Sequence, residues 1–145
     1  LIIRDTCRIR PGIPGLSDNI RVISVVGRFL EHSRIYYFRN GGNEEYFIGS
    51  ADLMMRNLES RAEVVVIVDD EHLCQQLHEY MEMQLNDSRN VWDMMSDSSY
   101  VHRLPEGEQP GSHWLMIEAA NKRHQDAQKA ELRRPKAIAK RSKRG

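Results

Sequence analysis

The stretch V-V-V-I-V-D-D, residues 64–70, decides the fold class that this sequence predicts. Residues 64–68 are five consecutive β-branched residues, and such a run is typical of a strand that is buried on both faces. Asp69 and Asp70 follow at once, and a short carboxylate caps the first turn of a helix well. The apolar residues after them recur at helical spacing, so we expect a helix as far as about Leu85. A strand that leads directly into a helix indicates an α/β protein.

The sequence predicts one hairpin before this strand and a second one after the helix. Residues 33–39 and 45–49 are rich in strand-forming side chains and flank an Asn-Gly-Gly-Asn turn. Residues 91–95 and 100–102 flank a Ser-Asp-Ser-Ser turn in the same way. Both pairs are short, as hairpin strands usually are.

The two ends of the chain predict simpler elements. Residues 1–8 read as a strand that enters a rigid loop at residues 10–15, where two prolines and two glycines disfavour regular structure. Residues 20–30 fit a short strand that passes into a helical turn. Residues 112–134 fit a helix, and from Pro135 onward the composition predicts disorder.

These elements predict one α/β sandwich domain in residues 1–104, a linker in residues 105–111, and a helix with a basic tail in residues 112–145. Strands that alternate with helices favour a parallel sheet. The chain begins without Met, and its first three residues, Leu-Ile-Ile, resemble the middle of a strand. We therefore expect that it was cut from a longer protein.

The composition is that of a soluble globular protein, with 40% hydrophobic and 29% charged residues. No apolar run approaches the ~20 residues that span a bilayer. The cysteines, Cys7 and Cys74, are too few for a disulfide framework, which favours a reducing, cytoplasmic setting. No histidines show metal-ligand spacing, and His113 is interpreted as an ordinary helix or surface residue.

Charge is distributed unevenly along the chain. Residues 111–145 hold ten Lys and Arg against three Asp and Glu, although the whole chain holds 21 of each kind. Such a tail can bind polyphosphate, RNA or an acidic membrane, but a solvated extension explains it more simply. Every basic residue before this region is an arginine, whose planar charge suits phosphate oxygens.

His32 and Arg34 are the pair of neighbouring residues that most suggests a functional site. A spacing of two at the start of a strand places both side chains on one face, where an imidazole and a guanidinium can address one phosphate. Spacing alone is weak evidence, because a His-x-Arg triplet often occurs by chance. Arg4, by the same standard, reads as a surface arginine or as a partner of Asp5 or Glu63.

A longer pattern changes this interpretation. It consists of four segments: L-I-I-R-D-T-C-R-I-R-P-G-I-P-G-L-S-D-N-I-R-V at residues 1–22, R-F-L-E-H-S-R-I-Y-Y-F at residues 28–38, G-S-A-D at residues 49–52 and R-N-L at residues 56–58. Together these segments resemble the final domain of bacterial polyphosphate kinases of the histidine-phosphorylating family, over residues 1 to about 104.

The resemblance implies a phospholipase D-like fold, whose His-x-Lys motif is echoed by His32 and Arg34 and whose Gly-Ser is echoed by Gly49-Ser50. It also implies reversible transfer of the γ-phosphate of ATP to polyphosphate through a phosphohistidine, with Mg²⁺ as cofactor. In that family the nucleophilic histidine and the metal ligands belong to parts that this chain lacks. The rest of the kinase chain, in a homo-oligomer, is then a partner, and no specific nucleic acid is expected.

The resemblance assigns roles to two residues. Arg4 corresponds to an arginine that binds the nucleotide phosphates, and His32 to a second active-site histidine that contacts the nucleotide and donates a proton. In a parallel sheet both would reach one end, where ligands of α/β proteins bind. Arg8, Arg10 and Arg34 would add positive potential for a polyanion.

The chain departs from the family pattern near residue 52. Leu53 and Met55 replace the usual Trp and Pro, and residues 64–68 lack a proline that is common before the last helix. These departures affect packing or a pocket wall. Asp52 itself either orients a neighbouring arginine or caps a turn.

We therefore predict part of an ATP-polyphosphate phosphotransferase that is inactive as an isolated chain. Two alternatives remain: a non-catalytic module that binds nucleotide or polyphosphate, and a phosphodiesterase of phospholipase D type. The arginine at position 34, where that motif has lysine, argues against the phosphodiesterase.

Overall fold

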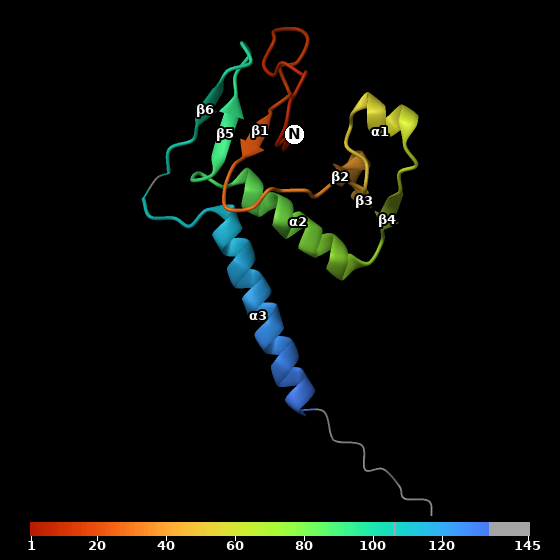
Figure 1. Cartoon of the computed structure of the whole chain (residues 1–145), viewed down its shortest axis with the longest axis vertical. Coiled ribbons are helices and arrows are strands. Elements are labelled where there is room, and N and C mark those ends of the chain that lie inside the picture. The colour runs from red at the N-terminus through yellow and green to blue at the C-terminus, as the bar shows by residue number, and fades with distance from the viewer. Residues whose placement is uncertain (106, 134–145) are drawn as a thin grey trace, which may run out of the picture.

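A computed structural model describes residues 1–105 and 107–133 of the chain. It holds two small three-stranded sheets, one near the start of helix α2 (Glu71–Leu85) and the other near its end (Figure 1). Helix α3 (Ser112–Arg133) projects away from both sheets. No helix in the described ranges is long and apolar enough to cross a membrane. The architecture is mixed α/β, as predicted.

The first sheet has the order β1-β5-β6, and all of its pairings are antiparallel. Its strands are β1 (Ile23–Val25), β5 (Val91–Met94) and β6 (Tyr100–His102). Ile23, Val25 and Val91 are almost fully buried and form the hydrophobic core cluster. The predicted hairpin in residues 91–102 is confirmed.

The N-terminal segment does not form the strand predicted for residues 1–8. Only a single parallel bridge joins Ile2 to Ile23. Residues 4 and 5 form a bend, where the carboxylate of Asp5 accepts a hydrogen bond from the backbone N–H of Thr6 at 2.8 Å, a local bond that competes with strand pairing. The predicted helical turn in residues 20–30 is also wrong, because β1 is followed by a loop with bends at residues 27–29.

The second sheet has the order β2-β3-β4 and is again antiparallel. Its strands are β2 (Ile35–Phe38), β3 (Glu45–Gly49) and β4 (Val65–Val68). The predicted hairpin is confirmed, with a short 3-10 turn at Asn40–Gly42 between its strands. The expectation of a parallel sheet is wrong, because hairpins and the short helix α1 (Met55–Ser60) join neighbouring strands in opposite directions.

Strand β4 contradicts the prediction of burial on both faces. Val65, Val66 and Ile67 are 54%, 51% and 54% exposed. β4 lies at an edge of its sheet and has only β3 beside it among the described residues. Its composition is that of an inner strand, but its position is that of an outer one.

The predicted helices are observed. The carboxylate of Asp70 accepts a hydrogen bond from the N–H of Leu73 at 2.9 Å and caps α2. Helix α3 matches the predicted helix through Arg133. Residue 134 and the tail predicted to be disordered lie outside the described residues, and the proposed boundaries at residues 104 and 111 stay predictions.

Asp87 ties the start of α3 to the end of α2. Its buried carboxylate accepts hydrogen bonds from the backbone N–H groups of Arg89 at 2.6 Å, Asn90 at 2.9 Å and Ser112 at 2.6 Å. Burial alone would raise the pKa of this carboxyl, but the hydrogen bonds from Ser112, Asn90 and Arg89 outweigh it, and the pKa is lowered.

Asp87 should therefore make the stability of the chain depend on pH. Because the pKa is lower in the folded state, the stabilisation is present above the unfolded pKa of about 3.9 and is lost as the pH falls through the folded pKa. Asp87→Asn should lower the free energy of unfolding at neutral pH, and its difference from the parent should shrink in acid. Urea unfolding across that range measures this, with Asp126→Asn on α3 as control. A constant difference down to the most acidic condition would contradict the prediction.

Candidate functional site

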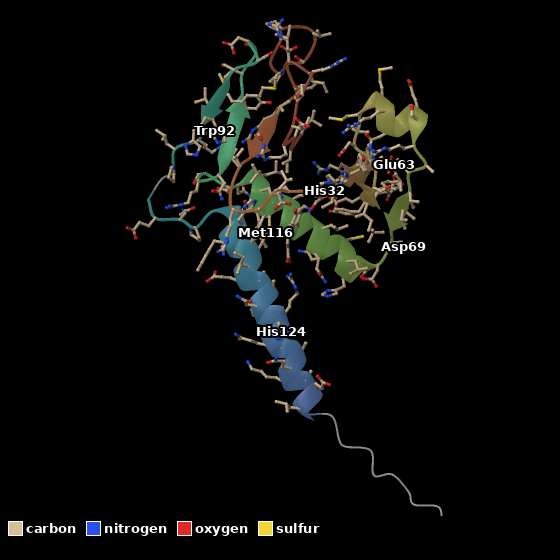
Figure 2. All side chains as sticks on the ribbon, viewed as in Figure 1. His32, Glu63, Asp69, Trp92, Met116 and His124 are labelled. Carbon is tan, nitrogen blue, oxygen red and sulfur yellow. The ribbon has the colours of Figure 1, made fainter. Side chains whose placement is uncertain are left out.

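The loop between β1 and β2 carries the candidate site. Figure 2 shows His32 between the two sheets, on the side of α2 opposite to the projecting part of α3. His32 is exposed, whereas Glu31 and Arg34 on either side of it are half-buried. The loop thus presents the imidazole and anchors its neighbours.

Arg34 is held between Asp52 and His32. Its Nε donates to Asp52 Oδ1 at 2.9 Å, and its Nη2 lies 2.9 Å from the same oxygen. Its Nη1 lies 2.5 Å from His32 Nδ1 and donates to the backbone carbonyl of His32 at 2.8 Å. Asp52 therefore orients an arginine, one of the two roles predicted for it, and the pair of His32 and Arg34 is in contact.

The Gly-Ser motif is bound to the start of β4. Ser50 donates a short hydrogen bond to the carboxylate of Glu63, and Asn57 Nδ2 donates to the same carboxylate at 3.0 Å. The bonds from Ser50 and then Asn57 lower the pKa of Glu63. Glu63 does not pair with Arg4, which was one of the alternatives for that arginine.

A second set of contacts joins the loop between β1 and β2 to helices α2 and α3. The hydroxyl of Tyr80 on α2 donates a short hydrogen bond to Glu31 and lies 2.7 Å from Ser33 Oγ. His113, which is buried in the first turn of α3, has its Nε2 3.2 Å from Glu31 Oε1. Its Nδ1 accepts a hydrogen bond from the backbone N–H of Phe29 at 3.1 Å. We call Glu31, Tyr80 and His113 the loop clamp.

The loop clamp requires a glycine at position 27. A Cβ added to Gly27 would lie 2.5 Å from His113 Nδ1, closer than side chains approach each other. His113 is thus a buried residue of helix α3, so that of its two interpretations the helix residue is confirmed and the surface residue is wrong. Sequence reasoning missed all three members of the clamp. Only Glu31 carried a signal, since it lies beside His32 in the family-like stretch.

Arg4 belongs to a different segment of the fold from His32 and Arg34. It follows the bridge to β1, which belongs to the first sheet, whereas His32 precedes β2 of the second sheet. The prediction of one parallel sheet that carries both residues is therefore wrong, and their approach to one nucleotide stays a prediction. Arg4 is exposed and makes no hydrogen bond or ion pair with residues 1–105 or 107–133. Arg10, in contrast, donates from Nε to the carbonyl of Ser96 at 2.8 Å.

The described residues contain no group of three or more His, Cys, Asp and Glu side chains that could hold a metal ion. They therefore do not fit a complete magnesium site. The chemistry that the site offers is that of an exposed imidazole beside a fixed guanidinium, which suits an anionic phosphate.

Comparisons with known proteins agree on one family. The family described as "Polyphosphate kinase C-terminal domain 2" matches residues 1–113. The chain is 51% identical over 105 residues to a polyphosphate kinase of Thermosynechococcus vestitus, which covers 72% of this chain and 14% of that protein. It is 53% identical over 103 residues to a polyphosphate kinase of Dictyostelium discoideum, covering 71% of this chain and 10% of the relative.

A solved structure supports the same relationship. The crystal structure of polyphosphate kinase from Porphyromonas gingivalis aligns with a TM-score of 0.70 at 34% identity, covering 79% of this chain and 18% of that one. The chain therefore spans less than a fifth of the length of these relatives.

The loop clamp should contribute measurably to stability. Tyr80→Phe removes a hydroxyl that bonds both Glu31 and Ser33, and burial, followed by the bond to Glu31, raises the pKa of that hydroxyl to about 12. We expect a loss of about 1–3 kcal/mol in the free energy of unfolding, because a buried carboxylate oxygen loses its donor. Urea unfolding measures the loss. Tyr37→Phe, which removes an exposed bond to Glu44, is the control, and an equal effect of both variants would refute the role of the clamp.

Proposed function

Because the chain belongs to the polyphosphate kinase family, we propose that it supplies part of the active site for reversible transfer of the γ-phosphate of ATP to polyphosphate. The single observation that carries this is His32, held exposed beside an arginine that Asp52 fixes, within a stretch typical of the family. The phosphohistidine would belong to a part of the kinase outside this chain.

His32 is the proposed proton donor. A guanidinium has no acceptor, so the nitrogen nearest to it, Nδ1 at 2.5 Å, must act as the acceptor of that contact. The proton of a neutral imidazole then resides on Nε2, which lies 3.2 Å from Arg34 Nη2 and would donate to a phosphate oxygen once the ring turns away from the guanidinium. Arg34 is a positioning residue in this scheme, because its orientation depends on Asp52 and it acts on the ring of His32.

Arg4 is proposed to neutralise charge on the nucleotide phosphates. Its guanidinium is exposed and has no partner among the described residues, so all five N–H donors are available to a polyanion. Arg8 is exposed as well and would extend the positive potential. Arg10 and Arg34 already hold protein partners, and their part would be weaker.

We further propose that the complete domain is phospholipase D-like. The Gly-Ser pair in that fold lies beside the histidine motif, and here the residues next to Gly49-Ser50 hold Arg34 through Asp52. Magnesium would neutralise phosphate charge with ligands from the rest of the kinase, and we derive no step through it. The remaining kinase chain and further copies of it are the proposed partners.

A non-catalytic binding module is the second candidate. It is favoured by the coverage of the relatives, since this chain matches only 14% of the first of them and His32 is the one exposed histidine on the loop between β1 and β2. This candidate predicts that the chain binds ATP or polyphosphate and that substitution of His32 leaves the turnover of the complete kinase unchanged.

We predict that the isolated chain forms no polyphosphate from ATP and magnesium, because the nucleophile is absent. The complete kinase should lose most of its activity on His32→Ala, at least about a hundredfold if the imidazole acts as a general acid. Polyphosphate synthesis measures both results, with His124→Ala on the exposed part of α3 as control. Turnover by the isolated chain, or an unimpaired His32 variant, would refute the corresponding half.

Arg4 should act mainly on nucleotide binding. In the complete kinase Arg4→Ala should raise the KM for ATP about tenfold, as expected for the loss of a charged hydrogen bond to phosphate. Steady-state kinetics measure the change, and Arg133→Ala at the end of α3 is the matched control. An unchanged KM for ATP would show that Arg4 is a surface residue.

A further inference from the structure

The outer face of the second sheet carries apolar side chains, of which Phe38, Val65 and Ile67 are exposed and Phe47 is half-buried. Side chains alternate between the two faces of a strand, and the register places Phe47 opposite Ile67 and Gly49 opposite Val65. Tyr46 and Val68 alternate with these residues and point toward α2: the hydroxyl of Tyr46 lies 3.0 Å from His78 Nδ1, and Val68 lines a hollow together with Leu73 and Leu77 of α2. Phe47, Val65 and Ile67 therefore face away from α2.

Phe38 extends this surface. Its ring lies 5.9 Å from that of Phe47, edge to face, and its side chain is 54% exposed, as are Val65 and Ile67. We call Phe38, Phe47, Val65 and Ile67 the outer patch. Exposed apolar side chains in a row along adjacent strands mark a binding surface more often than a free one.

The backbone of β4 offers a second, independent feature. The carbonyl of Val64 accepts a hydrogen bond from the N–H of Ser50 at 3.0 Å, so Val64 faces β3. Antiparallel pairing alternates, and Val66 and Val68 therefore face β3 too, while the N–H and C=O groups of Val65 and Ile67 point outward. No strand of the described residues lies beyond β4.

Nothing in β4 protects this open edge. Natural edge strands usually carry a lysine, a proline or a bulge that blocks pairing with another chain. Residues 64–68 are Val-Val-Val-Ile-Val and contain none of these. The edge of β4 and the outer patch thus consist of the apolar residues that are typical of a strand inside a sheet.

We propose that the edge of β4 and the outer patch are the docking surface for an apolar β-strand from the part of the polyphosphate kinase polypeptide that lies outside this chain. The inference rests on the proposed function, in which that part supplies the nucleophile. The chain spans 14% to 18% of the length of two relatives, so most of the polypeptide is available as this partner. An extended segment fits, because it satisfies the outward N–H and C=O groups of β4.

The position of this surface connects it to the candidate site. β4 begins two residues after Glu63, which binds Ser50, and the same Gly-Ser segment leads to Asp52 and Arg34. A strand added to β4 therefore brings its own residues close to the elements that hold His32. Docking would assemble the two halves of the active site.

Hydrogen exchange tests the proposal in the isolated chain and in the complete kinase that contains it. The amides of Val65 and Ile67 should exchange fast in the isolated chain and at least about a hundredfold more slowly in the complete kinase, at all protein concentrations. Fast exchange in both would overturn the proposal. Protection in the isolated chain that grows with concentration would also overturn it, since a second copy would then cover the edge.

A variant pair separates docking from a purely local effect. Ile67→Lys should leave the melting temperature of the isolated chain unchanged and lower that of the complete kinase, because the lysine is exposed in one and buried in the other. Leu132→Lys at the exposed end of α3 should change neither. An equal effect of Ile67→Lys in both proteins would contradict docking. Amide exchange rates and melting temperatures do not depend on enzyme turnover. They therefore test docking even if the proposed phosphotransfer activity is not observed.

Discussion

Glu31 is the residue on which the arrangement of this chain depends. The two sheets share no strand, and the loop that joins β1 to β2 has to cross between them with His32 on it. The carboxylate of Glu31 binds Tyr80 of α2 and lies 3.2 Å from His113 of α3, so a single side chain connects the loop to both helices. Apart from Glu31, the loop is joined to the two helices by the hydrogen bond of Phe29 to His113 and that of Ser33 with Tyr80.

This design separates anchoring from chemistry. Buried or half-buried neighbours, Glu31 and Arg34, take up the protein's own hydrogen bonds, and His32 between them stays exposed. Pre-orientation of this kind lets the imidazole meet a phosphate without first reorganising the loop. It also explains why acidic residues, Asp52 and Glu63, lie close to a site for an anion: each one is already occupied by a donor of the protein.

The second sheet shows an imbalance between composition and environment. Its inner face turns toward α2, where the hydroxyl of Tyr46 bonds His78, yet Ile48 and Val66 on that face are 42% and 51% exposed. On the outer face Phe38, Val65 and Ile67 are each 54% exposed. Burial and the nearby Glu44 raise the pKa of Tyr46 to about 12, which keeps its hydroxyl neutral beneath the sheet. Apolar side chains are therefore exposed on both faces of this sheet, in a chain that covers less than a fifth of the length of its relatives.

The sequence by itself determined the local elements and the family. The hairpins, the cap of α2 at Asp70 and the helix from Ser112 all follow from residues near one another in the chain, because turns, caps and periodicity are local properties. The stretch around His32 likewise identified the family without any structure. For the site, the sequence placed His32 next to Arg34 but left the role of Asp52 open.

Only the tertiary structure decided what depends on distant residues. The antiparallel order of both sheets, the exposure of β4 and the absence of a strand at Arg4 in the described residues all contradicted expectation. The residues of a strand show which of its faces are apolar. They do not show whether another part of the chain packs on those faces. The loop clamp joins residues 31, 80 and 113, and no local pattern records a contact across such separations.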